Sequence, residues 1–217
     1  NSPPIHWKAS AKATSKLTTS QRTCITKLFT GFHCTGTNMY RRGQWPTAQC
    51  PRCEQAEDHT HLHKCQSQHG QQSFIKAWEN LDDWVEKTSS QEIGQAIYIL
   101  LTDYRNNEEP RTTASTHWST ALQRAYSQQL KAGPRAFSEG MLVHEWVDAQ
   151  QNHYLQTNNK KNCPEAWTTQ LIYQLHKMNH TLWVERCEYV HEVKHQEDLH
   201  RQDYAIQLKY LLERPPP

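Results

Sequence analysis

A cysteine- and histidine-rich segment carries the residue types in this chain that are best suited to metal binding. Two residues separate Cys50 from Cys53, and eleven separate Cys53 from Cys65. A thiolate pair at this spacing can hold one Zn²⁺ through a tight turn, and a downstream His and Cys complete a tetrahedral site. His61 is the best fourth ligand, because three residues separate it from Cys65 and both side chains would share one face of a short helix.

The predicted zinc is structural. Four protein ligands leave no open position for a reactive water. The segment also has almost no apolar residues to fold around, so the metal would stabilise it. His59 and His63 lie in the same segment and stay open as substitutes for His61. A chance cluster in a histidine-rich chain is the alternative to a metal site.

A second string has the spacing of a catalytic metal site. His191-Glu192-Val193-Lys194-His195 matches the H-E-x-x-H pattern of zinc peptidases, in which the glutamate acts as a base. His200 or Glu213 could supply the third ligand. The chain contains 14 His and 15 Glu, and polar residues follow the string. We therefore interpret it as a solvated helix face, keep a zinc metallopeptidase as a remote alternative, and expect the chain not to be an enzyme.

Charge is distributed unevenly along the chain. Residues 1–53 contain eight bases and no acid (+8), residues 54–110 contain four bases and eleven acids (−7), and the remainder sums to +1. A basic block of this length is typical of proteins that contact phosphate backbones, so we predict RNA or DNA, single-stranded or at a target site, as a partner. The residues predicted to bind it are Lys8, Lys12, Lys16, Arg22, Lys27, Arg41, Arg42 and Arg52, with Trp45 either stacking on an unpaired base or covering the metal site.

The remaining cysteines bear on the cellular compartment. Cys24, Cys34, Cys163 and Cys187 show no disulfide-framework spacing, which favours a reducing, intracellular compartment, nuclear or cytoplasmic. We expect no signal peptide, transit peptide or membrane span. The chain begins at Asn1 rather than Met, so we expect it to be a piece of a longer product.

Helices are expected to position these residues. Apolar residues recur at three- and four-residue steps and no strand pattern stands out. This pattern predicts an all-α, irregular multi-helix assembly with a small CCHC zinc-stapled element. We expect Thr18 or Thr19 to cap one helix, residues 89–92 to form a capping box, Gly133-Pro134 to end a helix and Pro164 to begin the last. The predicted helices cover about 7–16, 19–30, 38–42, 74–85, 92–104, 118–130, 137–155 and 164–183.

A polar run with Asn106, Asn107 and Pro110 predicts an internal linker. The expected organisation is a basic helical segment with the zinc site at 1–66, an amphipathic helix pair at 67–104, a linker at 105–117 and a helical C-terminal domain at 118–217.

The zinc segment and its flanks resemble a known protein region. The residues that carry the likeness are Trp7, Lys27-Leu28-Phe29-Thr30-Gly31, Cys34-Thr35-Gly36, Arg41-Arg42, Cys50-Pro51-Arg52-Cys53, Glu57, His61, Leu62 and Cys65. Together they are similar to the zinc-binding region that follows the reverse transcriptase in non-LTR retrotransposon-like proteins of unicellular eukaryotes. The tail of such proteins is resembled by Trp146, Gln150-Gln151, Tyr154, Trp167, Leu171, Trp183-Val184-Glu185-Arg186 and His191.

Two departures from the family stand out. Cys187 takes the place of the usual Asn in a Trp-x-x-Arg-Asn step, and Glu54-Gln55 replaces a small residue after the second Cys. The sequence also lacks the Tyr-x-Asp-Asp string of the polymerase and the family's endonuclease signature. The resemblance implies a non-catalytic C-terminal segment that holds template RNA or target DNA near the polymerase part of the same protein. The alternative is a helical protein-interaction or structural module, a domesticated relic of such an element.

Overall fold

The computed structural model describes residues 4–106, 108 and 115–212, with the backbone alone described at 194 and 197–212. Ten helices and no strand occur in this part of the chain, so the predicted all-α class is confirmed. Two isolated antiparallel bridges, Ile5–Val143 and Gln49–Ala56, are also present there. The first ties the N-terminal segment to the body, and the second closes the cysteine turn.

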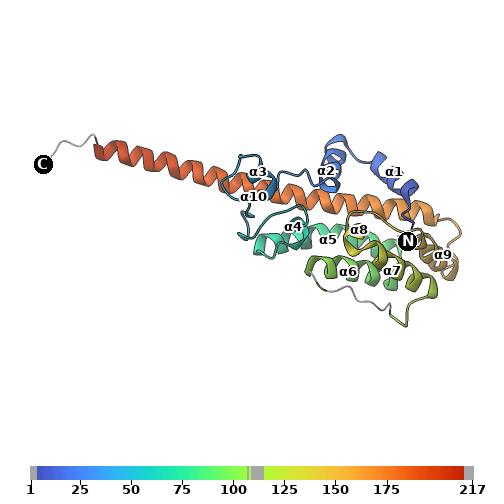
Figure 1. The fold of residues 1–217 in the computed structure, drawn as a ribbon. Helices are drawn as coiled ribbons and strands as arrows, with labels where there is room; N and C mark the ends of the chain where they lie inside the picture. The colour runs from blue at the N-terminus through green and yellow to red at the C-terminus, as the bar shows by residue number, and fades with distance from the viewer. Residues whose placement is uncertain (1–3, 107, 109–114, 213–217) are drawn as a thin grey trace.

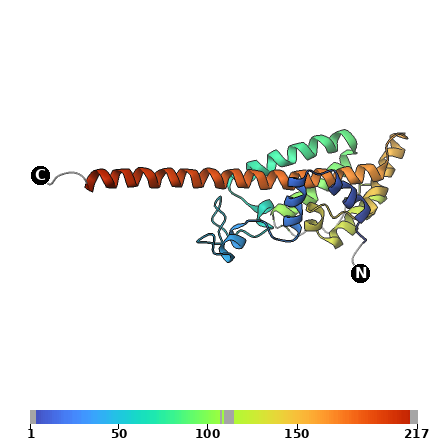
Figure 2. The ribbon, with the colours of Figure 1, turned by 90° about the horizontal axis from the view of Figure 1, so that it is seen from above.

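The long helix α10 (Pro164–Leu212) forms the axis of the molecule, and the other helices pack along it. Figure 1 shows α1 (Trp7–Ser15), α2 (Thr19–Phe29) and α3 (Gly36–Arg41) on one side of α10. The opposite side holds α4 (His61–Lys64), α5 (Gln68–Thr88), α6 (Gln91–Asn106), α7 (Thr120–Ala132), α8 (Pro134–Ser138) and α9 (Glu145–Gln156). The C-terminal part of α10 extends beyond all of them (Figure 2).

Polar side chains set where several helices begin. Thr18 forms the predicted cap of α2 as a capping box, because its hydroxyl accepts from the Gln21 N–H while the Gln21 side chain accepts from the Thr18 N–H. The capping box predicted at 89–92 is wrong in register. Ser90 caps α6 by accepting from the Ile93 N–H at 3.3 Å, whereas the neighbouring Ser89 accepts from the Trp167 indole N–H at 2.9 Å.

The single helix predicted over 137–155 is also wrong. Gly140 follows α8 with φ of +80°, a left-handed conformation that favours glycine and ends the helix. The chain then bridges to Ile5 at Val143 before α9 begins. The Gln129 side chain fixes this turn, because its oxygen accepts from the Val143 N–H and the Trp146 indole N–H, both at 3.1 Å.

The buried apolar side chains form one cluster. The stripe predicted on α10 lies in it, with Trp167, Leu171, Leu175, Met178 and Leu182 all buried. The cluster also takes residues from 1–66, 67–104 and 118–182, so these segments share a core. The predicted domain boundaries stay predictions. Of the predicted linker at 105–117, residues 107 and 109–114 lie outside the described residues, and Arg105 belongs to α6.

Within the described residues, no helix combines the length and the apolar content that crossing a membrane requires.

Candidate metal centre

A tight turn presents the first two cysteines. The Cys50 N–H donates to the Gln55 carbonyl at 2.7 Å, and the Glu54 N–H donates to the Cys50 carbonyl at 2.8 Å. Glu54 has φ of +62°, so the turn places a residue other than glycine in the left-handed region. The Arg52 N–H points at the Cys50 sulfur at 3.4 Å. The turn therefore brings the sulfurs of Cys50 and Cys53 to one side, as the two-residue spacing predicts.

The short helix α4 and the residue after it supply the other two ligands. The Asp58 carboxylate accepts from the His61 N–H at 2.9 Å and so holds the start of α4. The Cys65 N–H donates to the His61 carbonyl at 2.9 Å, which places the two side chains one turn apart on the same face. His61 Nε2 lies 3.2 Å from the Cys53 sulfur, across the gap between the turn and α4.

The four predicted ligand atoms meet in one place. The sulfurs of Cys50, Cys53 and Cys65 and a ring nitrogen of His61 lie within 4.8 Å of one another. A tetrahedral metal with metal–sulfur bonds of about 2.3 Å holds its ligand atoms about 3.8 Å apart. The cluster is therefore close to the size that a four-coordinate ion requires, and three of the four ligands are buried.

The two alternative histidine ligands lie elsewhere. His63 is buried, and its Nε2 is 2.7 Å from Oδ1 of Asn179 on α10. The His59 ring lies beside Gly31 in the turn after α2. Neither belongs to the metal-sized cluster found among the described residues, so His61 is the histidine of the site.

The cluster is also set up electrostatically to hold a cation. A side-chain hydrogen bond between Cys50 and Cys65 lowers the pKa of the Cys65 thiol to about 2 and raises the pKa of the Cys50 thiol. Burial raises the pKa of Cys53. Cys65 is therefore the most easily ionised of the three thiols, and a metal ion would displace the thiol protons that remain.

Arg52 was predicted to contact phosphates, and the structure places it where it cannot. Its side chain is buried, and its three guanidinium nitrogens are shielded from solvent and have no hydrogen-bond partner among the described residues. Its positive charge is among the causes that lower the pKa of Cys65, after the hydrogen bond from Cys50. The charge of Arg52 therefore acts on the cysteine cluster, and its buried side chain is not exposed to a nucleic-acid backbone.

The ion pair between Glu57 and Arg186 is buried and joins α10 to residues 50–65, termed the metal element. Glu57 accepts two hydrogen bonds from Arg186, at 3.0 Å from Nε and 2.6 Å from Nη2. A third hydrogen bond reaches the same carboxylate from the Gly36 N–H at 2.6 Å. The Arg186 guanidinium lies 5.2 Å from the ring centre of Trp45 and 5.3 Å from that of Trp183. Trp45 is thus half-buried against Arg186, and its predicted stacking on a base stays a prediction.

Three further residues support the site, and the sequence interpretation did not identify them. Arg105, assigned to the linker, is buried and donates to the carbonyls of His63 at 2.6 Å and Cys65 at 3.3 Å. Gly70 lies against Cys65, where a Cβ would stand 2.6 Å from the Cys65 carbonyl oxygen. Asn179 anchors His63, as described above. Gly70 left a sequence signal, because it is a lone glycine five residues after the last ligand.

The seven other predicted nucleic-acid-binding bases are exposed, but they do not form one surface. Lys8, Lys12 and Lys16 belong to α1 or its C-cap, Arg22 and Lys27 to α2, and Arg41 and Arg42 to the end of α3. Figure 1 shows α1 and α3 near different parts of α10 with α2 between them, so the basic block is spread over three helices.

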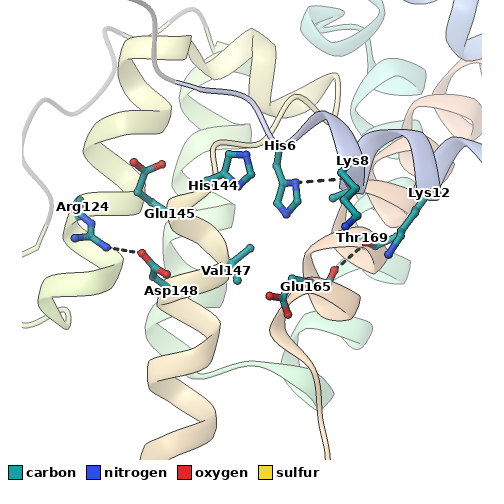
Figure 3. Close-up of a pocket in the computed structure, with 11 residues that line it drawn as sticks. His6, Lys8, Lys12, Arg124, His144, Glu145, Val147, Asp148, Glu165 and Thr169 are labelled. Carbon is teal, nitrogen blue, oxygen red and sulfur yellow. Dashed lines mark hydrogen bonds and ion pairs between the residues drawn. The ribbon is translucent and has the colours of Figure 1, made fainter.

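The group on α1 faces acids. Lys8 and Lys12 line a cavity of about 410 Å³ together with Glu145 and Asp148 of α9 and Glu165 of α10. Figure 3 shows the two lysines on one side of this cavity and the two α9 acids across it. Residues 1–53 contain no acid, but the fold places Lys8 and Lys12 near acids of α9 and α10. The exposed bases of α2 and α3 are therefore the better candidates for phosphate contacts.

The His191-Glu192-x-x-His195 string lies on α10 beyond Arg186. All three named side chains are exposed, and the Glu192 carboxylate accepts from Gln196 at 2.9 Å. They do not belong to the metal-sized cluster found in the described part of the chain. The side chains of His200 and Glu213 lie outside the described residues.

Comparison with known proteins gives no match: no family model, no curated protein and no solved structure matches this chain.

Proposed function

We propose that this chain is a zinc-stapled, nucleic-acid-binding segment of a retroelement reverse-transcriptase protein, architectural rather than catalytic. The observation that carries the proposal is the cluster of three cysteine sulfurs and one histidine nitrogen within 4.8 Å. Sulfur and imidazole ligands in a tetrahedral set favour Zn²⁺ over harder cations. Zinc would stabilise the turn and α4, and with four protein ligands it would leave no position for a substrate.

The residues around the cluster support the family assignment. Glu57 and Arg186 both belong to the motifs that resemble the retroelement proteins, and they form a bidentate pair across 129 positions of the sequence. Three thiolates and a neutral histidine leave bound Zn²⁺ with a charge of −1, and the buried Arg52 would compensate it. Exposed Arg22, Lys27 and Arg41 would hold phosphates without reading sequence.

Metal analysis and oligonucleotide binding test the proposal in two steps. The purified chain should contain one zinc per molecule, and Cys53→Ser should lose it together with local helicity by circular dichroism. Wild type should bind a single-stranded RNA or DNA oligonucleotide with an affinity that falls steeply as salt rises. Replacing Arg41 and Arg42 by Gln should flatten the salt slope by about 1.4, at about 0.7 per lost phosphate contact. The zinc assignment would be refuted if the purified chain contained no metal and its circular dichroism spectrum did not change when a chelator was added.

The second candidate is a protein-interaction module. The C-terminal part of α10 favours it, because this part projects beyond the body as a single helix (Figures 1 and 2). This candidate predicts one zinc per chain and no oligonucleotide binding at low salt. Oligonucleotide binding therefore separates the two functions, while zinc content is common to both.

A further inference from the structure

The turn between α2 and α3 carries an exposed aromatic ring on a fixed backbone. Phe32 is 56% exposed. Its N–H donates to the Lys27 carbonyl at 2.8 Å. The buried Asn38 of α3 donates from Nδ2 to the carbonyls of Gly31 and His33, at 2.6 and 2.7 Å. Both neighbours of Phe32 are therefore held by one side chain, while the phenyl ring stays in solvent.

The same asparagine orients a cation beside the turn. Nη2 of Arg41 donates to Oδ1 of Asn38 at 2.9 Å. Arg41, three positions after Asn38 on the same helix face, is thereby held on the side of the Phe32 turn, and Arg42 follows it as the C-cap of α3. Both arginines and Lys27 are exposed. Glu57, which accepts from the Gly36 N–H at the start of α3, is already paired with Arg186.

His33 lies in the same turn and is buried. Its pKa is lowered to about 4, mainly by burial and to a smaller extent by the charges of Lys27 and Arg186. A neutral His33 can pack on the Trp183 ring of α10, where the ring centres are 4.0 Å apart. His33 therefore anchors the turn on α10, while the neighbouring Phe32 ring is exposed to solvent.

A single exposed phenylalanine is ordinary on a protein surface, but a fixed one among oriented cations matches one class of ligand. Single-stranded nucleic acid offers unpaired base faces and regularly spaced phosphates, and proteins bind it with aromatic rings beside basic side chains. A duplex keeps its base faces stacked and cannot use the ring in this way.

We propose that Phe32 stacks on an unpaired base of single-stranded RNA or DNA while Lys27, Arg41 and Arg42 hold the flanking phosphates. The inference rests on the proposed function and deepens it, because it specifies a single strand as the ligand and names the residue that distinguishes a single strand from a duplex.

The test uses the full chain with zinc bound and fluorescence anisotropy on an unstructured oligonucleotide and on a duplex of the same length. Phe32→Ala should weaken single-strand binding by roughly fivefold to a hundredfold, the usual effect of losing one stacked base. The salt slope and duplex binding should stay at wild-type values, and Phe32→Trp should restore single-strand binding. Trp7→Ala is the matched control, because Trp7 is 63% exposed in the same acid-free stretch but lies on α1. Circular dichroism and zinc content verify the fold of each variant.

The outcomes separate this inference from the proposed function. If wild type binds and the Arg41, Arg42 double variant loses affinity while Phe32→Ala behaves like Trp7→Ala, the stacking role is wrong and the proposed function stands. If the wild-type chain does not bind the oligonucleotide, both the proposed function and the stacking role of Phe32 are wrong. Binding of wild type to anionic lipid vesicles that depends on Phe32, without oligonucleotide binding, would assign the ring to a membrane surface and overturn both as well.

Discussion

Removing the charge of Glu57 should be among the most destabilising single substitutions in this chain. The Glu57 and Arg186 side chains are 2% and 4% exposed, so solvent cannot replace a lost partner. Breaking a buried ion pair from one side costs about 3–5 kcal/mol, because it leaves an uncompensated buried charge. Glu57→Gln should fall near 3 kcal/mol, since the amide oxygen still accepts one hydrogen bond. Arg186→Met should approach 5 kcal/mol, because it leaves the carboxylate with the Gly36 N–H as its remaining described donor.

The double variant gives the sharper measurement. Glu57→Gln with Arg186→Met leaves no charge in the interface, so its cost should lie well below the sum of the two single costs. Urea unfolding followed by circular dichroism, with zinc present throughout, gives the three free energies of unfolding. Exposed Lys87→Met is a control for losing a solvated ion pair, here with Asp83, and should cost less than about 1 kcal/mol. Single costs below 1 kcal/mol for Glu57→Gln and Arg186→Met, or strict additivity, would refute the argument that this pair fastens the metal element.

Two further predictions concern charges near the site and in the core. Arg52→Met should weaken zinc affinity by roughly tenfold to a hundredfold in a chelator competition, as loss of a supporting group around a metal commonly does. Substitution of the exposed Arg22 by Met is the control and should leave the affinity unchanged. Equal zinc affinity in both variants would show that Arg52 has no such role. Burial lowers the pKa of His176 to about 4, from an ordinary value of 6.5, so as pH falls from 6.5 towards 4 the unfolded state takes up a proton first and the free energy of unfolding decreases. From pH 7 to pH 5 this histidine should account for about 2 kcal/mol of lost stability, and urea unfolding of His176→Gln should show a pH-dependent loss smaller by that amount; an unchanged loss would mean that His176 is not buried neutral.

Local signals in the sequence were sufficient for several helix ends and for the four residues of the candidate metal cluster. Thr18, Gly133 and Pro164 mark helix ends in the structure, because capping, a left-handed stop and a proline start depend on a few neighbouring residues. The cysteine and histidine spacing identified the ligands for the same reason: the turn and α4 are short enough that spacing alone sets their geometry.

Contacts between distant residues explain what the sequence left open. The apolar period from Phe137 to Trp146 suits a continuous helix, and the break follows from the bridge between Val143 and Ile5. The Glu57–Arg186 pair joins residues that no periodicity relates. The acid-free stretch is a property of the sequence alone, because folding brings Lys8 beside acids of α9 and α10 and buries Arg52. Net charge along a chain therefore predicts a surface only where the packing partners are also known.

Because α10 is long, a small tilt near Arg186 would move the C-terminal end of the helix by several ångströms. Beyond Arg186 the helix continues for 26 residues to Leu212, which at 1.5 Å per residue is about 39 Å. A tilt of about 10° at the root would move the tip by about 7 Å over that length. Arg186 lies at the base of this extension and pairs with the buried Glu57, so one ion pair links the segment that carries the cysteine turn to the direction in which the extension points.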